Sequence, residues 1–170
     1  GESISMKDSD NTCPSKGWIL AFHPDLICGT VLGANIRDYT FFSYRPEEAL
    51  HVSLREKQVI LELLDKINEE LQRCIDCYSQ KIISKYIELL LDYCERFYER
   101  QFITRNEANK KIIERFDRLL DDHFNTIQSQ SSDLPTIEEC VRVLRLSPAY
   151  FNDLLEYETG KSYKEYLQFK

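Results

Sequence analysis

The sequence contains little of the material that turns require, with 5 glycines and 5 prolines among 170 residues. This scarcity disfavours an all-β fold, in which each of many short strands ends in a turn. No apolar run approaches the roughly 20 residues that span a bilayer, so we expect no membrane segment. Positive charge is also scarce, because 22 Lys and Arg face 29 Asp and Glu, a formal net charge of −7. That balance argues against a chain that holds nucleic acid by charge alone.

Catalytic motifs are equally scarce. The three histidines, His23, His51 and His123, lie far apart in the sequence, and none has a motif around it. The chain has no G-x-S-x-G, no phosphate-binding glycine loop and no H-E-x-x-H. We interpret the glutamate pairs at 47–48 and 69–70 as solvated charge, since adjacent side chains on a helix point in different directions. The sequence therefore predicts no enzyme, no catalytic residue and no cofactor.

The six cysteines do not suggest a disulfide framework or a metal site. Cys74 and Cys77 form a single C-x-x-C that we expect inside a helix, without the further ligands that zinc needs. Cys74, Cys94 and Cys140 fall on apolar stripes of predicted helices, where a free thiol acts as a small hydrophobe. Residues 1–16 are polar and lack the apolar core of a signal peptide. We expect reduced thiols, no metal and a cytoplasmic location.

The first third of the chain differs in texture from the rest. Residues 1–16 are expected to form a loose polar lead. Residues 18–22 (WILAF) and 39–44 (YTFFSY) predict two short aromatic strands, with a short helix from residue 24 to about 32 between them. So few strands do not make an independent sheet, so we expect this β piece to rest on the helices that follow.

Residues 53–128 predict a helical region. Ser53 is a good N-cap, and Glu56 completes a capping box three residues later. A seam of apolar residues then recurs at heptad spacing: Ile60, Leu64, Ile67, Leu71, Cys74 and Tyr78. Such a seam packs either against a second copy of the chain, which would make a homodimer, or against the next helix of the same chain. That next helix, about 80–102, carries two neighbouring apolar stripes and is expected to be buried on two sides.

The last part of the chain, residues 134–170, follows a Ser/Gln/Asp linker at 128–133. Thr136 with Glu139 starts one short helix, and Ser147 with Pro148 starts a second, which ends at Gly160. Two short helices joined by a brief turn make a helix-turn-helix. The sequence thus predicts a mainly α fold, a helical bundle with a short N-terminal β piece and a C-terminal helix-turn-helix.

Three ordered blocks in this last part carry a family resemblance. Residues 136–139 (TIEE) open the first helix, residues 146–151 (LSPAYF) open the second, and residues 158–162 (ETGKS) match a motif E-T-G-x-S that Tyr166 and Leu167 follow. At this spacing the segment resembles the first helix-turn-helix of AraC-type transcription regulators. Upstream, residues 98–105 (YERQFITR), 39–44 and 48–50 (EAL) are similar to members with an N-terminal cupin sensor and a helical dimerisation segment.

The resemblance implies a division of the chain. Residues 17–52 would be the end of the sensor, residues 53–128 the dimerisation region, and residues 134–170 an incomplete DNA-binding domain. The family has two helix-turn-helices bridged by a long helix, and this chain stops inside that bridge. We therefore expect a fragment, or a short relative, of a DNA-binding regulator, with DNA and a second copy as partners and room for a small-molecule effector.

The expected DNA contacts lie on the second helix of the pair, which enters the major groove in the family. They are Ser147, Ala149, Asn152, Asp153 and Glu156. Asn152 can pair with adenine, Ala149 can touch a thymine methyl, and Asp153 can accept a hydrogen bond only from cytosine. Glu156 would be a like charge near the phosphates.

The segment departs from the family pattern at two positions and in its charge. Val141 stands where the family favours a small residue, and Arg145 where it favours glycine, so a left-handed turn there costs about 1 kcal/mol. Residues 134–170 also hold five Lys and Arg against six Asp and Glu. Because phosphate neutralisation dominates DNA affinity, we expect weak binding by this chain alone. The alternative is a helical dimerisation or protein-interaction module that does not bind DNA.

Overall fold

The computed structural model describes residues 17–127 and 135–170. Over these ranges the chain is helical and contains no strand. The elements are α1 (Pro24–Ile27), α2 (Val31–Asn35), the 3-10 helices η1 (Thr40–Ser43) and η2 (Pro46–Glu48), α3 (Leu54–Leu71), α4 (Ser79–Thr104), α5 (Asn106–Ile127), α6 (Ile137–Leu144), α7 (Pro148–Thr159) and α8 (Tyr163–Gln168). The expected loose lead at 1–16 and linker at 128–133 lie outside the described residues.

The mainly α fold is confirmed, but the predicted N-terminal β piece is wrong. Residues 18–22 have no regular secondary structure, and no other described segment forms a strand with which they could build a sheet. Residues 40–43 form η1 instead, in which the Phe41 ring faces α4 and the Phe42 ring is exposed. Phe41 stacks on Tyr98 with 5.5 Å between ring centroids, and the Tyr39 hydroxyl donates to Asp92 Oδ1 at 2.6 Å.

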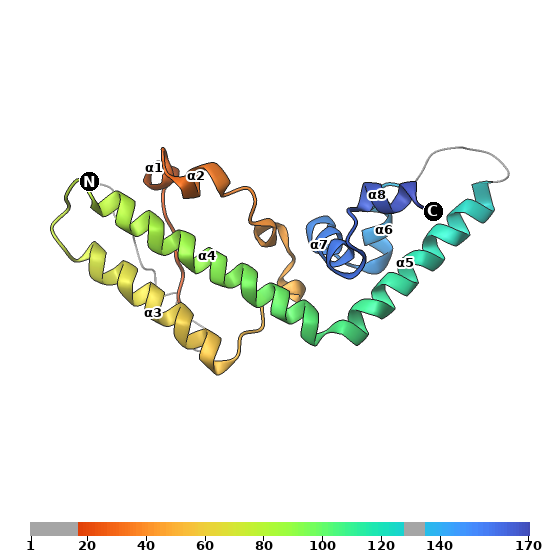
Figure 1. Ribbon diagram of the computed structural model, residues 1–170, viewed down its shortest axis with the longest axis horizontal. Helices are drawn as coiled ribbons and strands as arrows, with labels where there is room; N and C mark the ends of the chain where they lie inside the picture. The colour runs from red at the N-terminus through yellow and green to blue at the C-terminus, as the bar shows by residue number, and fades with distance from the viewer. Residues whose placement is uncertain (1–16, 128–134) are drawn as a thin grey trace, which may run out of the picture.

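The N-terminal unit, α1 to α4, is built on an antiparallel pair of helices. α3 begins at the predicted N-cap Ser53, whose capping box with Glu56 is present, and runs beside α4 (Figure 1). Residues 24–44 cover one side of α4, where buried apolar side chains form a common cluster. Its buried members are Ile27, Leu32, Tyr39, Ile67, Ile83, Ile87 and Leu91.

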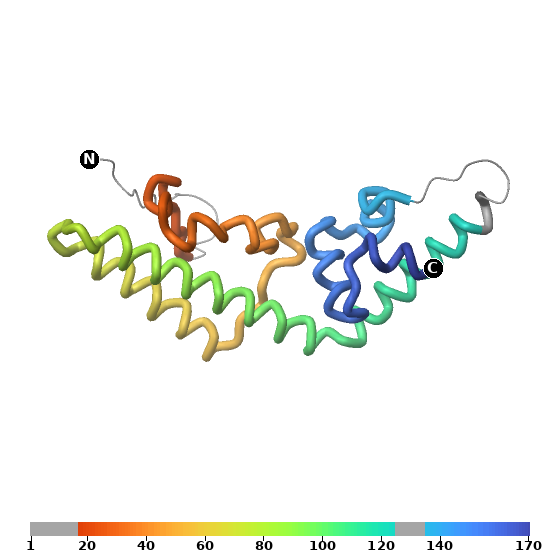
Figure 2. The backbone as a smooth tube through the Cα atoms, turned by 45° about the horizontal axis from the view of Figure 1, so that its top comes forward, coloured from red at the N-terminus to blue at the C-terminus, as the bar shows by residue number. Residues whose placement is uncertain are grey.

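α4 and α5 meet at a corner that gives the molecule a bent, elongated shape (Figures 1 and 2). α4 ends at Thr104, and α5 begins at Asn106, so that Arg105 alone separates the two helices. Asn109, 1% exposed, closes the corner because its Nδ2 donates to the Phe102 carbonyl at 2.9 Å. A buried side-chain amide thus ties the first turn of α5 to the last turn of α4.

In the C-terminal unit, α5 to α8, the long helix α5 forms one arm of the bend, and the short helices α6, α7 and α8 lie on its inner side (Figure 2). The core of this unit joins one face of α5 to the inner faces of α6, α7 and α8. The buried members are Phe116, Leu120, Cys140, Val141, Leu144, Phe151, Leu155, Tyr163 and Leu167. α8 is tied down at both ends, since the Tyr163 hydroxyl donates to the Pro135 carbonyl at 2.8 Å and the Tyr166 hydroxyl to Asp117 at 2.8 Å. Burial and that bond to Asp117 raise the pKa of Tyr166 to about 12.

Among the described helices, none combines the length and the apolar character that crossing a bilayer requires. The two units are joined by a smaller cluster of Phe102, Tyr150 and Leu154, with Tyr44 packed against it. The expected DNA-contact helix, α7, therefore touches Tyr44 and Phe102 of the N-terminal unit.

Candidate nucleic-acid interface

The pair α6 and α7 forms where the capping residues predict it. Thr136 and Glu139 exchange the two hydrogen bonds of a capping box at the start of α6. Ser147 caps α7, because its Oγ accepts from the Tyr150 amide at 3.2 Å, and Pro148 occupies the first helical position. The predicted helix starts are confirmed because each rests on contacts within four residues.

The turn between α6 and α7 passes through a left-handed residue. Arg145 has φ 60° and ψ 40°, the conformation for which glycine is favoured. The Leu146 amide donates back to the Val141 carbonyl at 3.0 Å and closes the turn. Val141 itself is buried in the C-terminal core, so the larger side chain at this position is accommodated by packing.

The inner face of α7 is fully buried. Phe151, Leu154 and Leu155 are each 0% exposed, and the Phe151 ring meets the Phe116 ring edge-on at 4.9 Å. The predicted contact residues accordingly lie on the other sides of α7. Their contacts on these sides determine which of them are exposed to solvent.

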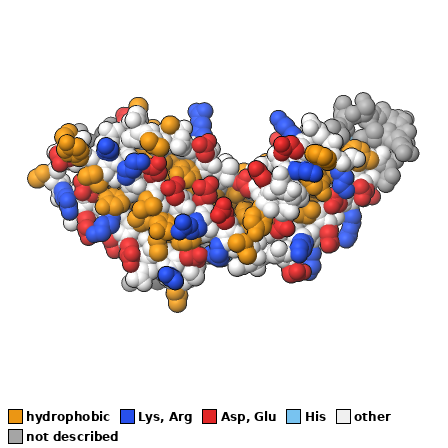
Figure 3. All heavy atoms as spheres, viewed as in Figure 1, with side chains coloured by type: hydrophobic (Ala, Val, Ile, Leu, Met, Phe, Trp, Pro, Cys, Tyr) orange, Lys and Arg blue, Asp and Glu red, His pale blue; other side chains and the backbone are white. Residues whose placement is uncertain are grey.

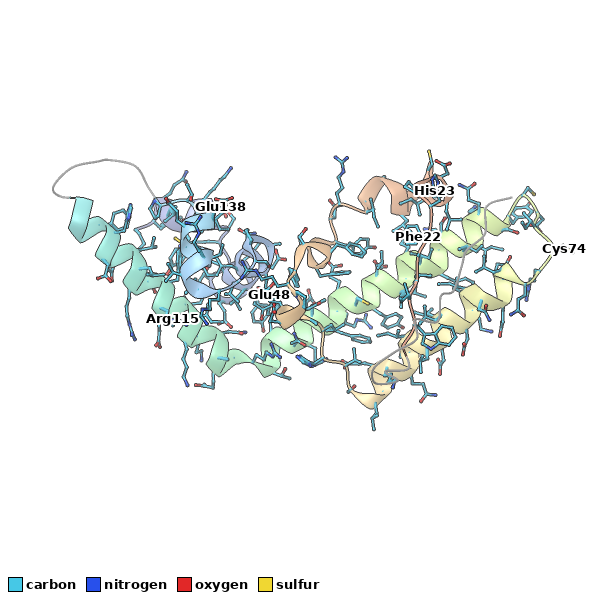
Figure 4. All side chains as sticks on the ribbon, turned by 180° about the vertical axis from the view of Figure 1, so that it is seen from behind. Phe22, His23, Glu48, Cys74, Arg115 and Glu138 are labelled. Atoms are coloured by element: carbon cyan, nitrogen blue, oxygen red, sulfur yellow. The ribbon has the colours of Figure 1, made fainter. Side chains whose placement is uncertain are left out.

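Ser147 and Asp153 are already engaged by the N-terminal unit. The amide and the hydroxyl of Ser147 each donate to the Glu48 carboxylate at 2.6 Å. Asp153 Oδ2 accepts from the Tyr44 hydroxyl, also at 2.6 Å. Figure 4, which labels Glu48, shows it at the junction of the two units, beside the helices of the C-terminal unit.

The other three predicted contact residues differ in exposure. Asn152 is half-buried, and its Oδ1 accepts from the Tyr163 amide at 3.1 Å, which helps to start α8. Ala149 is half-buried, and Glu156 is exposed. In this arrangement Glu156 is thus the one member of the predicted set that lies open to solvent.

Glu48 overturns the interpretation of the 47–48 pair as solvated charge. Glu47 is exposed, but Glu48 is 4% exposed and accepts hydrogen bonds from Arg45 and Ser147. Nothing in the local sequence identifies Ser147, 99 residues away, as its partner. The contact could be found only from the tertiary structure.

A cleft of about 390 Å³ runs between α4, η1 and α7. Its carboxylates come from both units: Asp38, Glu95, Glu99, Asp153 and Glu156. Partial burial and the neighbouring negative charges raise the pKa of Glu95. Figure 3 shows acidic side chains gathered where the two units meet. This charge repels a phosphate backbone from the exposed edge of α7.

The residues of the predicted dimer seam do not share one face, because they differ in burial and not all of them lie in α3. Ile67 is 3% exposed and packs within the chain against α4, while Ile60 and Leu64 are half-buried and Leu71 is 40% exposed. α3 ends at Leu71, so Cys74 and Tyr78 lie beyond it, exposed, in the loop before α4. Figure 4 shows Cys74 at the far tip of the N-terminal unit, which corrects the expectation of a C-x-x-C inside a helix.

An exposed apolar stripe on α4 was not expected. The sequence predicts burial of both stripes of this helix, but Ile82 is 36% and Leu89 43% exposed. Together with Tyr78 and Tyr86 they line an open groove of about 720 Å³, edged by Lys81, Lys85, Glu88 and Asp92. Figure 3 shows hydrophobic side chains gathered over α4.

Comparison with known proteins gives no match to a family model, a curated protein or a solved structure.

Proposed function

We propose that the chain is a fragment, or a short relative, of a cytoplasmic DNA-binding transcription regulator of the AraC type, in which α6 and α7 are the first helix-turn-helix. The observation that carries the proposal is the turn at Arg145. This turn joins two capped helices and sets α7 across the core, so that one face of α7 is completely buried. Ala149, Asn152, Asp153 and Glu156 lie off that face. A second helix held in this way is the element that enters the major groove in helix-turn-helix proteins.

Binding by this chain alone is weak in the proposal. The helix pair offers Asn152 and Ala149 as base contacts but carries more negative than positive charge. Base contacts specify a sequence, whereas phosphate contacts supply most of the affinity. The proposed regulator therefore depends on a second copy or further DNA-binding elements for tight binding, and an effector would act on the N-terminal unit.

A charge reversal tests the proposal. Duplexes are selected from a random pool at low salt, and their affinity is measured by fluorescence anisotropy. Glu156→Lys on α7 should bind the selected duplex more tightly and with a steeper salt dependence, because it adds a phosphate contact. Glu114→Lys on α5, an exposed residue outside the pair, is the matched control. Equal gains for the two variants would mean that general charge, not α7, holds the DNA.

A second candidate function is a homodimerisation module, and the exposed stripe on α4 favours it. Contiguous apolar groups at Ile82 and Leu89, with lysines and acids alongside, suit a helix of a second copy. Light scattering should then find a dimer at micromolar concentration. The double variant Ile82→Glu, Leu89→Glu should be monomeric, and Ile103→Glu, at the end of α4, should remain dimeric. A monomeric parent protein would contradict this function.

A further inference from the structure

Residues 44–48, which follow η1 and include η2, contact α7 at two of its predicted DNA contacts, Ser147 and Asp153. Glu48 reaches the helix start and Tyr44 reaches one turn further along. Tyr44 and Asp153 are 109 positions apart in the sequence, and Glu48 and Ser147 are 99 positions apart. Both contacts are made to α7. We name this stretch the 44–48 segment.

The Glu48 carboxylate takes the place of a phosphate at the start of α7. It accepts from the Ser147 amide and hydroxyl at 2.6 Å each, and it is almost fully shielded from water. An anionic oxygen that accepts from a helix N-terminal amide and its capping hydroxyl is the arrangement by which such helices hold a DNA phosphate. Glu48 and a DNA backbone therefore compete for the same two donors on Ser147.

The second contact fixes the base-reading side. The Tyr44 ring lies edge-on to Tyr98 of α4 and to Tyr150 of α7, with centroid separations of 5.1 Å each. The Tyr44 hydroxyl donates to Asp153, and this bond together with burial raises the pKa of Tyr44. Asp153 is thereby turned toward the protein instead of a base.

The contact has the character of a switch. It combines the hydrogen bonds with the edge-on contact of the Tyr44 ring to Tyr150, whereas Phe151 and Leu155 of α7 belong to a core supplied by α5, α6 and α8. Moving the 44–48 segment away would leave that core intact. The next residues are anchored independently, since Gln101 of α4 holds the His51 amide at 2.7 Å.

We infer that the 44–48 segment is an autoinhibitory latch, which masks α7 from DNA through Glu48–Ser147 and Tyr44–Asp153 and must lift before DNA binds. The inference rests on the proposed function. It names the segment between the N-terminal unit and the DNA-contact helix as the point at which binding is regulated.

The test uses the full 170-residue chain and two matched double variants. Tyr44→Phe with Glu48→Ala removes both latch bonds. Tyr39→Phe with Glu56→Ala is the control, because Tyr39 donates to Asp92 and Glu56 accepts from Ser53, both inside the N-terminal unit. Circular dichroism checks the fold, and the single variant Glu48→Ala, which removes the acceptor of Ser147, replaces the double variant if that does not fold.

Two readouts separate the latch from the proposed function. Amide hydrogen exchange by NMR should speed up at Ser147 by at least about tenfold in the latch variant and stay unchanged in the control, because Ser147 loses its acceptor. A duplex selected from a random pool on the latch variant should bind that variant at least about tenfold more tightly than the parent chain, and the control should match the parent.

The other outcomes overturn either the latch alone or the latch together with the proposed function. Unchanged exchange at Ser147 would overturn the latch, because the contact would not protect the helix start. Faster exchange with equal affinity of all three chains for the duplex would overturn the latch and leave the proposed function standing. Faster exchange with no duplex preferred by any chain would overturn the proposed function, and the latch with it.

Discussion

The two units of the chain bury their apolar side chains to different degrees. In the C-terminal unit Phe116, Leu120 and Phe151 are fully buried, and α5 to α8 surround them. In the N-terminal unit Trp18 and Ile19 are 52% and 82% exposed, and the α4 stripe is also open. The C-terminal unit thus has a closed apolar core of its own, whereas the N-terminal unit leaves apolar side chains exposed on its surface.

The largest expected effect tests whether the two cores are independent. Phe151→Ala should destabilise the C-terminal unit by about 3–5 kcal/mol, and Ile87→Ala the N-terminal unit by about 2–5 kcal/mol. Urea unfolding gives the free energies, and regional hydrogen exchange shows which helices lose protection. Phe169→Ala, at a ring that is 74% exposed, should change little. Loss of protection in α3 and α4 on Phe151→Ala would show one cooperative unit instead of two.

The corner between the units gives the next effect. Asn109→Ala leaves the buried Phe102 carbonyl without its side-chain donor, which should cost about 1–3 kcal/mol. Asn68→Ala on α3, where the side chain is half-buried, is the matched control and should cost less. Urea midpoints compare the two variants. A similar small loss for both would mean that the Asn109 amide does not hold the corner.

A smaller effect concerns the turn inside the C-terminal unit. Arg145→Gly removes the left-handed strain of a side chain, for an expected gain of up to about 1 kcal/mol. Arg142→Gly replaces the same residue type inside α6 and should instead cost about 1 kcal/mol. Thermal unfolding should therefore move in opposite directions for the two variants. Destabilisation by both would show that the Arg145 side chain makes a contribution larger than its strain.

The smallest effect compares the capping boxes of the two units in acid. A backbone bond from Thr136 lowers the pKa of Glu139 below its ordinary 4.5. At Glu56 burial acts to raise the pKa, but bonds from Ser53 and Arg100 outweigh it and lower the pKa. A carboxyl whose pKa is lowered by folding stabilises the fold at pH values above its ordinary pKa. This stabilisation is lost as the pH falls through the pKa of the folded chain.

NMR titration of the two carboxyls should therefore find both midpoints below 4.5. Glu139→Gln keeps the capping-box pattern, so stability near neutral pH should change little while the acid dependence of α6 becomes shallower. A midpoint for Glu139 at or above its ordinary value would mean that the box does not persist in solution.

The features that the sequence predicts well are local ones. Ser53 with Glu56, Thr136 with Glu139, Ser147 with Pro148, and Gly160 at the end of α7 each act within a few residues, and the structure has all of them. Capping depends on neighbours in the chain, so a sequence shows it directly. The starts of α3, α6 and α7 were predictable for that reason.

The features that it predicts poorly depend on distant partners. The aromatic run at 39–44 has strand propensity, but rings on α4 and α7 decide its conformation. Glu48 lies in an acidic pair with no local sign of burial, and its partner is in the last helical unit. The two stripes of α4 look alike in the sequence, yet residues 24–44 cover only one of them.

The buried amide of Asn109 has a consequence for geometry at a larger scale. In the proposed regulator, if two copies pair along α4, the corner at 102–109 determines how far apart their two α7 helices stand, because the Asn109 amide ties α5 to α4. The distance between the two half-sites on an operator would then be set by this corner, not by the residues that contact bases. In the same proposed dimer, a residue inserted into α4 just before the corner would rotate each α7 about the axis of α4 by roughly 100° and change the expected half-site spacing.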